Sequence, residues 1–441
     1  MPIVATVGDA LQRLFGELAQ TAASEAGVIQ RLRKFTPLSL ARTFVLGFVR
    51  HPQASDEQLA QMAAQCGAEV TPQAIEQRQS ARLVDFLERL FRGATQWMVG
   101  ADKAMAPILE RFPRVTVLDS STIRLPDALQ DRFRGCGGTH DTGVAVMKLQ
   151  TELDLRSGAL EHVQIEPGRC ADRGTSRQDQ RRLPGSLRIT DLGYFAITVF
   201  AAMHTAGEYF LSRLQFGTYV RYENVTIDIL RWLSNRREAF VDVPILLGQD
   251  QLPCRMIAWR LPPEQANRRR QKLRAEMKKK KKGRQPSAER LAWCDWTILV
   301  TNVPPALLTP SEAAVLYRAR WQIELLFKRW KSQGLVEELS GSSVARQMVR
   351  VWSRLLAAVV QHWLTVASVW GDPSKSLSKV YEAIRDFASR LAAALDRRTE
   401  LERVLADMHR TFGKTCNRNK RSNEGTFELL NDVQRLNFGL T

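Results

Sequence analysis

The sequence predicts an α/β protein with helical regions at both ends. Residues 1–112 and 343–441 show helical periodicity and helix-capping residues. Residues 113–205 contain short apolar strands that end in aspartate, residues 206–305 contain further strand-like runs, and residues 306–342 contain a long capped helix. Alternation of strands and helices in the middle of the chain indicates an α/β core. We expect these five segments to be the structural regions of the protein.

Two short helices are predicted within the N-terminal region. They cover residues 55–64 and 71–78, and Gly67 separates them. Two helices joined by a Gly-containing turn resemble a helix-turn-helix, although an ordinary helical hairpin has the same pattern. In a helix-turn-helix the second helix would present three polar side chains to base edges, Gln73, Gln77 and Arg78.

Two short apolar strands each deliver a carboxylate at their end. The first ends in Asp119 and the second in Asp191. Between them, residues 144–155 and 159–165 are predicted to form a β-hairpin. Aspartate often caps a following helix, so one such strand end is weak evidence for a catalytic site. Two of them, together with a glutamate on a later helix, make a stronger case.

A long helix is predicted to begin after Thr309. Thr309 at the cap, Pro310 at the first helical position and Glu312 at the third form a capping box. No further Gly or Pro follows before Gly334, where the helix is expected to end.

One side of this helix carries Tyr317, Arg320, Glu324 and Lys331. At about 100° per residue, these side chains fall within roughly a 60° arc. Arg, Lys and a Tyr hydroxyl can hold phosphate oxygens, and a carboxylate among them can hold a divalent cation. The stripe therefore suits metal-assisted chemistry on a phosphate backbone. The alternative is a solvated charged helix face, and physical reasoning alone does not separate the two.

The charge of the chain points to a polyanionic partner. Formal net charge is +18, and residues 260–290 contain 13 Lys or Arg against 3 Glu. This stretch includes Arg268 to Arg270 and the run Lys278 to Lys282. We expect it to be an arm that binds a nucleic-acid backbone, and the alternative is a flexible solvated loop.

Composition excludes several other classes. A hydrophobic content of 44% excludes a mostly disordered chain, and no apolar stretch approaches the ~20 residues needed to cross a bilayer. No secretory leader is recognised. The six cysteines include no C-x-x-C pair, which predicts reduced thiols and no zinc site. These features predict a cytoplasmic protein that does not enter the membrane.

The spacing Tyr-x2-Arg-x3-Glu-x6-Lys, from Tyr317 to Lys331, resembles the C-terminal signature of bacterial insertion-sequence-four family transposases. These enzymes belong to the DDE group, whose fold is ribonuclease H-like. The strings Asp119-Ser-Ser-Thr and Asp191-Leu-Gly-Tyr-Phe resemble the first and second acidic motifs of the family. The resemblance covers roughly residues 110–335. It implies a ribonuclease H-like core and a β-rich insertion between the second Asp and the Glu.

The resemblance implies a cut-and-paste DNA transposase. Asp119, Asp191 and Glu324 would be the catalytic residues and would bind two Mg²⁺ ions, with Mn²⁺ as a substitute. The partners would be the double-stranded DNA of the element's ends and of the target, and the protein would act as a homodimer in a synaptic complex associated with the nucleoid. With the basic run included, the expected DNA contacts are Arg213, Lys278, Lys279, Lys280, Lys281, Lys282, Trp296, Tyr317, Arg320, Lys328 and Lys331.

Some alternatives remain open at this point. Trp296 occupies a place where relatives carry a Trp that stacks on a flipped base, but a core Trp on a half-buried strand has the same sequence pattern. Some relatives have Asp-Arg where this chain has Asp191-Leu, which leaves local backbone contacts open. The other candidate functions are a metal-dependent nuclease or resolvase of the same fold, and a catalytically dead DNA-binding protein descended from a transposase.

Overall fold

The computed structural model describes most of the chain. The described residues are 6–29, 34–101, 106–138, 143–180, 182–236, 238, 240–280, 285–332, 343–419 and 425–433. They form two compact units, each assembled from separate stretches of sequence. Unit 1 comprises Met1–Met105, Ser120–Cys170 and Gln322–Ser422, and unit 2 comprises Ala106–Asp119, Ala171–Trp321 and Asn423–Thr441.

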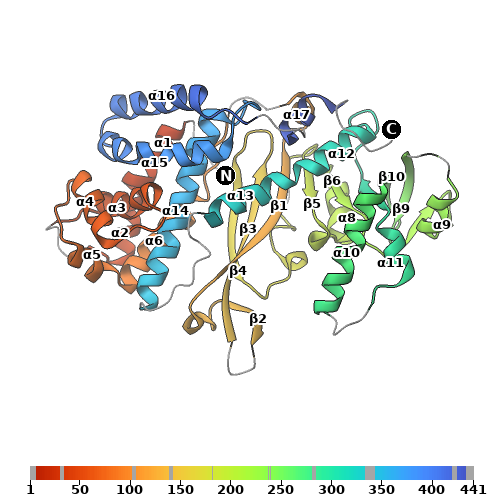
Figure 1. Ribbon diagram of the computed structural model, residues 1–441, viewed down its shortest axis with the longest axis horizontal. Coiled ribbons are helices and arrows are strands. Elements are labelled where there is room, and N and C mark those ends of the chain that lie inside the picture. Colours follow the sequence, from red (N-terminus) through yellow and green to blue (C-terminus); the bar gives the residue numbers. More distant parts are fainter. Residues whose placement is uncertain are drawn as a thin grey trace. The chain divides into compact units, whose positions relative to one another are not determined.

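Most of unit 1 is helical. Its helices are α1 (Val7–Arg13), a π-helical turn (Leu14–Leu18), α2 (Ala19–Ala26), α3 (Pro37–Arg50), α4 (Asp56–Gln65), α5 (Pro72–Arg78), α6 (Ala81–Ala94), α13 (Trp321–Trp330), α14 (Val344–Val369), α15 (Leu377–Ala394) and α16 (Arg398–Thr415). The long helix α14 is buried along most of its length and packs on α3 and α6 (Figure 1). α15 packs on α3 and α16. The C-terminal helices thus pack against the N-terminal ones.

The predicted pair of short helices is confirmed as α4 and α5. Ser55 forms a capping box with Gln58, and the intervening Gly67 has φ +79°, a conformation that favours glycine. Arg346 of α14 forms ion pairs with Asp56 and, at 2.7 Å, with Glu76. The helix pair is therefore held against α14 through its acidic residues.

The predicted hairpin is also confirmed in unit 1. β3 (Gly143–Asp154) pairs antiparallel with β4 (Leu160–Pro167) and with β2 (Arg134–Gly138), and a 3-10 turn (Asp127–Leu129) precedes β2. Gly158 in the hairpin turn has φ +75°, and a Cβ there would lie 2.5 Å from the Trp370 ring. Only glycine fits at this turn.

Unit 2 contains a mixed sheet with the order β1-β5-β6-β11-β10-β9-β7-β8. The strands are β1 (Val115–Arg124, which continues into unit 1), β5 (Leu187–Thr190), β6 (Tyr209–Arg213), β7 (Val220–Tyr222), β8 (Val225–Thr226), β9 (Phe240–Leu247), β10 (Leu252–Arg260) and β11 (Trp296–Thr301). β1, β5 and β6 are parallel, and the strands beyond β6 are antiparallel. β6 lies within the expected insertion but extends the parallel part of the sheet. The predicted strands of the insertion are confirmed.

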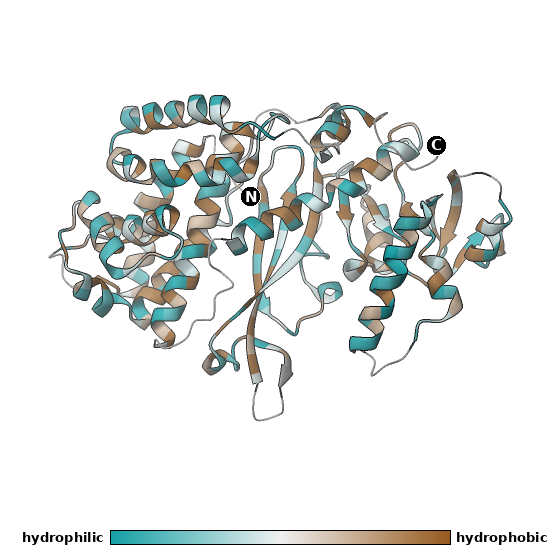
Figure 2. Ribbon diagram, viewed as in Figure 1, coloured by the Kyte–Doolittle hydropathy of each residue, from teal (hydrophilic) through white to brown (hydrophobic). Residues whose placement is uncertain are grey.

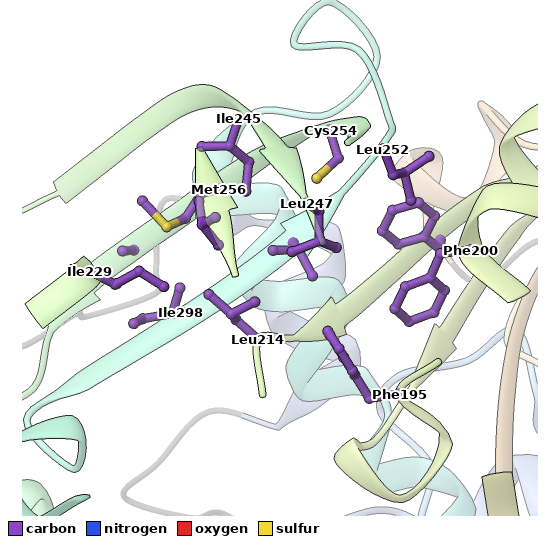
Figure 3. Packing of buried hydrophobic residues seen from close by; sticks show 14 of the residues in the cluster. Phe195, Phe200, Leu214, Ile229, Ile245, Leu247, Leu252, Cys254, Met256 and Ile298 are labelled. Carbon is purple, nitrogen blue, oxygen red and sulfur yellow. The ribbon is translucent and has the colours of Figure 1, made fainter. Parts of the chain in front are cut away.

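Unit 2 also contains helices. They are α7 (Pro107–Glu110), α8 (Ile197–Thr205), α9 (Ile229–Ser234), α10 (Pro263–Lys280), α11 (Ala288–Trp293), α12 (Pro310–Ala319) and α17 (Thr426–Asn431), with 3-10 turns at Asp172–Gly174 and Leu192–Tyr194. A buried apolar cluster joins α8 and α9 to β6, β9, β10 and β11 (Figure 3). In it the rings of Phe200 and Phe210 stack at 4.4 Å. This cluster is the hydrophobic core of the insertion and of the adjoining parallel strands.

A buried arginine fixes the loop that leads into α12. Arg255 of β10 pairs with both carboxylate oxygens of Asp242, at 3.1 and 2.7 Å. It also donates hydrogen bonds to the carbonyl oxygens of Val303 and Leu308, at 2.8 and 3.0 Å. Charge-assisted hydrogen bonds of this kind are among the stronger polar contacts. Arg255 therefore holds the start of α12 against the sheet.

The long helix predicted after Thr309 is divided in two. Its capping box is confirmed, because the Thr309 hydroxyl accepts from the Glu312 amide at 3.4 Å and Glu312 accepts from the Thr309 amide at 2.8 Å. At Arg320 the backbone remains right-handed, but its amide bonds to Tyr317 O, three residues back, at 3.2 Å. This tighter turn ends α12, so the stripe calculated for one regular helix is shared by α12 and α13. The expected helix end at Gly334 lies outside the described residues.

No helix in the described part of the chain is both long and apolar enough to cross a membrane.

Candidate active site

Two aspartates and an arginine end the parallel part of the sheet. β1 pairs with β5, and β5 with β6, in a register that aligns the ends of the three strands. The position immediately after the last aligned pair is occupied by Asp119 in β1, by Asp191 after β5 and by Arg213 in β6. Equivalent positions of neighbouring parallel strands lie about 4.8 Å apart and face the same side of the sheet. The fold of unit 2 therefore brings Asp119, Asp191 and Arg213 into one row.

Helix α12 supplies two further polar groups to this row. The Tyr317 hydroxyl donates to Asp191 Oδ1 at 3.3 Å, and Arg320 Nη1 lies 3.5 Å from Asp119 Oδ2. Both contacts are long for hydrogen bonds and are correspondingly weak. The Arg320 guanidinium also lies 6.0 Å from the centre of the Tyr317 ring. The two carboxylates thus face a hydroxyl and a cation that can also bind an incoming anion.

The protonation of Tyr317 follows from this environment. Burial, and then the negative charge of Asp191, raise the pKa of Tyr317 well above its ordinary value. The phenol therefore keeps its proton throughout the physiological pH range. It can donate a hydrogen bond to a phosphate oxygen but cannot act as a phenolate nucleophile.

The remaining members of the predicted stripe lie in unit 1. Glu324, in the first turn of α13, is half-buried, whereas Lys328 is exposed. Lys331 follows α13 in a π-helical turn and is exposed. Among the described residues, no group of three or more His, Cys, Asp or Glu side chains is arranged to hold a metal ion. The candidate metal-binding carboxylates that the strand register aligns are therefore Asp119 and Asp191.

The predicted basic arm is a helix rather than a loop. Figure 2 shows α10 as hydrophilic along most of its length. Arg268 is exposed, but Arg269 and Arg270 face inward and anchor the helix. Arg270 bonds to Asp295 and, at 3.3 Å, to the carbonyl of Leu291.

The end of α10 carries the basic run. Lys278 and Lys279 are exposed, and Lys280 is its last residue. Lys281 and Lys282 lie outside the described residues. The described lysines thus extend from a helix whose beginning is anchored, and the flexible-loop alternative does not fit this part of the run.

Trp296 lies in the hydrophobic core of the insertion and is only 8% exposed. It starts β11 and borders a cavity that is also lined by Arg236 and Arg260. Stacking of this ring on a base stays a prediction. The burial of the ring fits the core role, which the sequence left open beside base stacking.

Comparisons with known proteins agree with the sequence motifs. The family described as "Transposase DDE domain" matches residues 110–360, more than half of the chain. The chain belongs to the DDE transposase family. It is 28% identical over 450 residues to the transposase for insertion sequence element IS231B of Bacillus thuringiensis subsp. berliner, a match that covers 94% of this chain and 92% of that protein. Similarity to the IS231C transposase is comparable, at 27% identity, 97% of this chain and 95% of the relative.

A shorter match, 37% identical over 106 residues, relates the transposase to putative transposase InsL for IS186A of Escherichia coli, covering 24% of this chain and 28% of that protein. Membership of the family confirms the expected ribonuclease H-like core and its general activity as a polynucleotidyl transferase. Enzymes of the family use divalent metal ions. The donor set fits such ions, because Asp119 and Asp191 offer hard carboxylate oxygens from adjacent strand ends.

Arg269 of the transposase is a candidate functional residue that the sequence did not single out. In the sequence it contributes only to the positive charge of residues 260–290. Successive residues of a helix are rotated by about 100°, so three arginines in a row cannot all face solvent or all face the protein. From a helical run of three arginines one can therefore predict that at least one of Arg268, Arg269 and Arg270 faces the sheet.

The core position of Trp296 leads to a stability prediction. Trp296→Ala should lower the free energy of unfolding by about 3–5 kcal/mol, because it removes a large buried side chain and leaves a cavity. Chemical denaturation of the wild type and the variant measures this loss. Unchanged stability, together with a selective defect in a step after the first nick, would instead support the base-stacking role.

Proposed function

We propose that the transposase cuts DNA at the ends of its element and joins those ends to a new target. The observation that carries this proposal is the alignment of Asp119 and Asp191 on neighbouring strand ends, opposite Tyr317 and Arg320 of α12. Two carboxylates beside phosphate-binding donors suit chemistry on a phosphodiester rather than on a neutral substrate.

Asp119, Asp191 and Glu324 would hold two Mg²⁺ ions. Bound Mg²⁺ supplies Lewis acidity to the scissile phosphate and lowers the pKa of an attacking water or DNA 3′-hydroxyl. Glu324 joins the set because the family signature places it four residues after Arg320. Mn²⁺, which also prefers oxygen ligands, would substitute.

The other side chains bind and orient the DNA. The Tyr317 hydroxyl donates a hydrogen bond to a phosphate oxygen, and the raised pKa of Tyr317 keeps that donor protonated. Arg320 has five N–H donors, so it can contact Asp119 and a phosphate at the same time. Lys328 and Lys331 would bind further phosphates of the strand next to the cut.

Recognition of the element's ends needs contacts outside the catalytic site. We place sequence recognition on α5, where Gln73 and Gln77 are exposed, whereas Arg78 lies 5.4 Å over the Phe35 ring and is less available. A homodimer that holds two ends together would complete the reaction. Strand joining separates this function from that of a nuclease or resolvase, which would cut but not join.

The carboxylates are tested by replacements that keep their shape. Asp119→Asn, Asp191→Asn and Glu324→Gln should each abolish Mg²⁺-dependent cleavage of end DNA and keep its binding within a few-fold, because metal ligands carry chemistry rather than affinity. Gel assays of cleavage and of DNA binding measure the two effects separately. Asp250→Asn, a change on an exposed loop of unit 2, is the matched control and should cleave normally. Strong residual cleavage by Glu324→Gln would remove Glu324 from the metal site.

The basic run is tested by salt dependence. Replacing every lysine of the run from Lys278 through Lys282 by Gln should weaken binding about equally for end DNA and random DNA, because lysines that bind phosphates do not read sequence. The slope of log affinity against log salt should fall by ~0.9 for each phosphate that the variant no longer neutralises. Fluorescence anisotropy at several salt concentrations measures both quantities. An unchanged slope would mean that these lysines do not touch DNA.

A further inference from the structure

A cavity of ≈ 700 Å³ opens beside Asp191, at the inward face of α10. Four cationic side chains contribute to its lining, Arg213, Arg269, Lys272 and Arg290, and two carboxylates, Asp191 and Glu276. The cavity therefore has a net positive lining and one wall shared with the proposed metal site. It lies entirely within unit 2.

Arg269 is held in a fixed orientation in this cavity. Its Nη1 donates to the carbonyl oxygen of Trp296 at 3.0 Å, and its Nη2 donates to Thr297 Oγ1 at 3.0 Å. Both partners lie at the start of β11, so the sheet orients the guanidinium. A guanidinium carries five N–H donors, and these two bonds leave others for a ligand.

Arg213 and Arg269 place two positive charges close together. Burial, and then the charge of Arg213, lower the pKa of Arg269 to about 10. In the part of the chain that the structure describes, neither arginine forms an ion pair with a carboxylate. Holding like charges near each other with partial loss of water is unfavourable. An anion between them would relieve that cost.

An apolar wall borders the same space. The rings of Phe216 and Trp293 meet edge to face at 5.4 Å, and the Arg290 guanidinium lies 5.3 Å over Phe216. Such a wall excludes water on one side and strengthens an ion contact at the cavity.

We propose that Arg269 joins Arg213, which the family resemblance already implies as a DNA contact, in binding one phosphate of the DNA backbone, and that Arg269 is a positioning residue that sets the strand beside Asp191. The proposal rests on the proposed function, because it identifies the anion as DNA. Two guanidinium groups can share the oxygens of one phosphate, and the orientation of Arg269 by β11 reduces the ordering needed on binding. The contact adds a second grip on the strand, on the side of Asp191 away from Arg320.

Cys294 in the cavity lining provides a test on the unaltered protein. Its thiol lies among Arg269, Arg213 and Phe216, and Cys136 is exposed elsewhere and serves as the internal reference. The transposase is treated with N-ethylmaleimide in EDTA, with and without a pre-cut duplex that carries the element's end, and peptide mass spectrometry follows both thiols. We expect DNA to slow the labelling of Cys294 by about fivefold or more and to leave Cys136 unchanged. Equal labelling of Cys294 with and without DNA would overturn the proposal.

Two variants on the same helix test the arginine itself. Arg269→Gln should weaken binding of the pre-cut duplex about tenfold, the factor expected for one charged hydrogen bond. Arg268→Gln removes the same charge from the exposed side of α10, where the side chain is 79% exposed, and should have an effect below about threefold. Equal effects of the two changes would overturn the positioning role. Thermal unfolding of both variants identifies a loss that comes from misfolding, and Arg269→Lys should recover only part of the affinity because it lacks the planar fork.

The outcomes separate this proposal from the proposed function. Binding and Cys294 protection are measured without metal, so they do not depend on cleavage. If Cys294 is protected but no DNA is cut in Mg²⁺, the phosphate site stands and the cleavage activity fails. If Asp191→Asn abolishes cleavage while Cys294 stays fully reactive in the DNA complex, the activity stands and the phosphate site fails. Protection by inorganic phosphate as strong as that by DNA would make the cavity a general anion site and would overturn the DNA assignment.

Discussion

The register of the three parallel strands β1, β5 and β6 is the constraint on which the site depends. Their inner residues are fully buried, among them Val115, Val117, Ile189 and Leu211. A shift of one residue in either ladder would turn every one of these side chains to the opposite face. The hydrophobic core therefore fixes the register, and the register in turn fixes which residues stand in a row at the strand ends. Packing and chemistry are specified by the same pairing.

The position of α12 over that row is fixed by polar contacts at the start of the helix. Arg255 ties the loop before α12 to β10, and the capping box at Thr309 sets where the helix begins. From that start, Tyr317 and Arg320 reach the two aspartates at the end of the helix. In the row, two carboxylates stand next to each other and Arg213 follows, while the Tyr317 hydroxyl and the Arg320 guanidinium face the carboxylates.

Local signals in the sequence predicted the helices and strands well. Features that depend on contacts between distant residues were not predicted. Helix caps, apolar strands and turn glycines depend on neighbours in sequence, which is why the hairpin, the α4–α5 pair and the capping box were all predicted. No Gly or Pro lies at the break at Arg320, so the sequence predicted a single helix. Burial of Trp296 and the inward direction of Arg269 depend on which face of β11 and α10 meets the core, and spacing alone does not show that. The alignment of Asp191 with Arg213 needed the register of β5 and β6, which a single sequence does not reveal.

The most direct test of the account asks where a divalent ion binds. Fe²⁺ can replace Mg²⁺ at oxygen-ligand sites and, with ascorbate and peroxide, cleaves the protein backbone close to where it is bound. The account predicts cuts next to Asp119, Asp191 and Glu324 that excess Mg²⁺ suppresses and that Asp191→Asn removes. Sizing the fragments by mass spectrometry locates the cuts. Backbone cleavage only at other positions, from a protein that still cuts DNA in Mg²⁺, would contradict the claim that the aligned strand ends form the metal site.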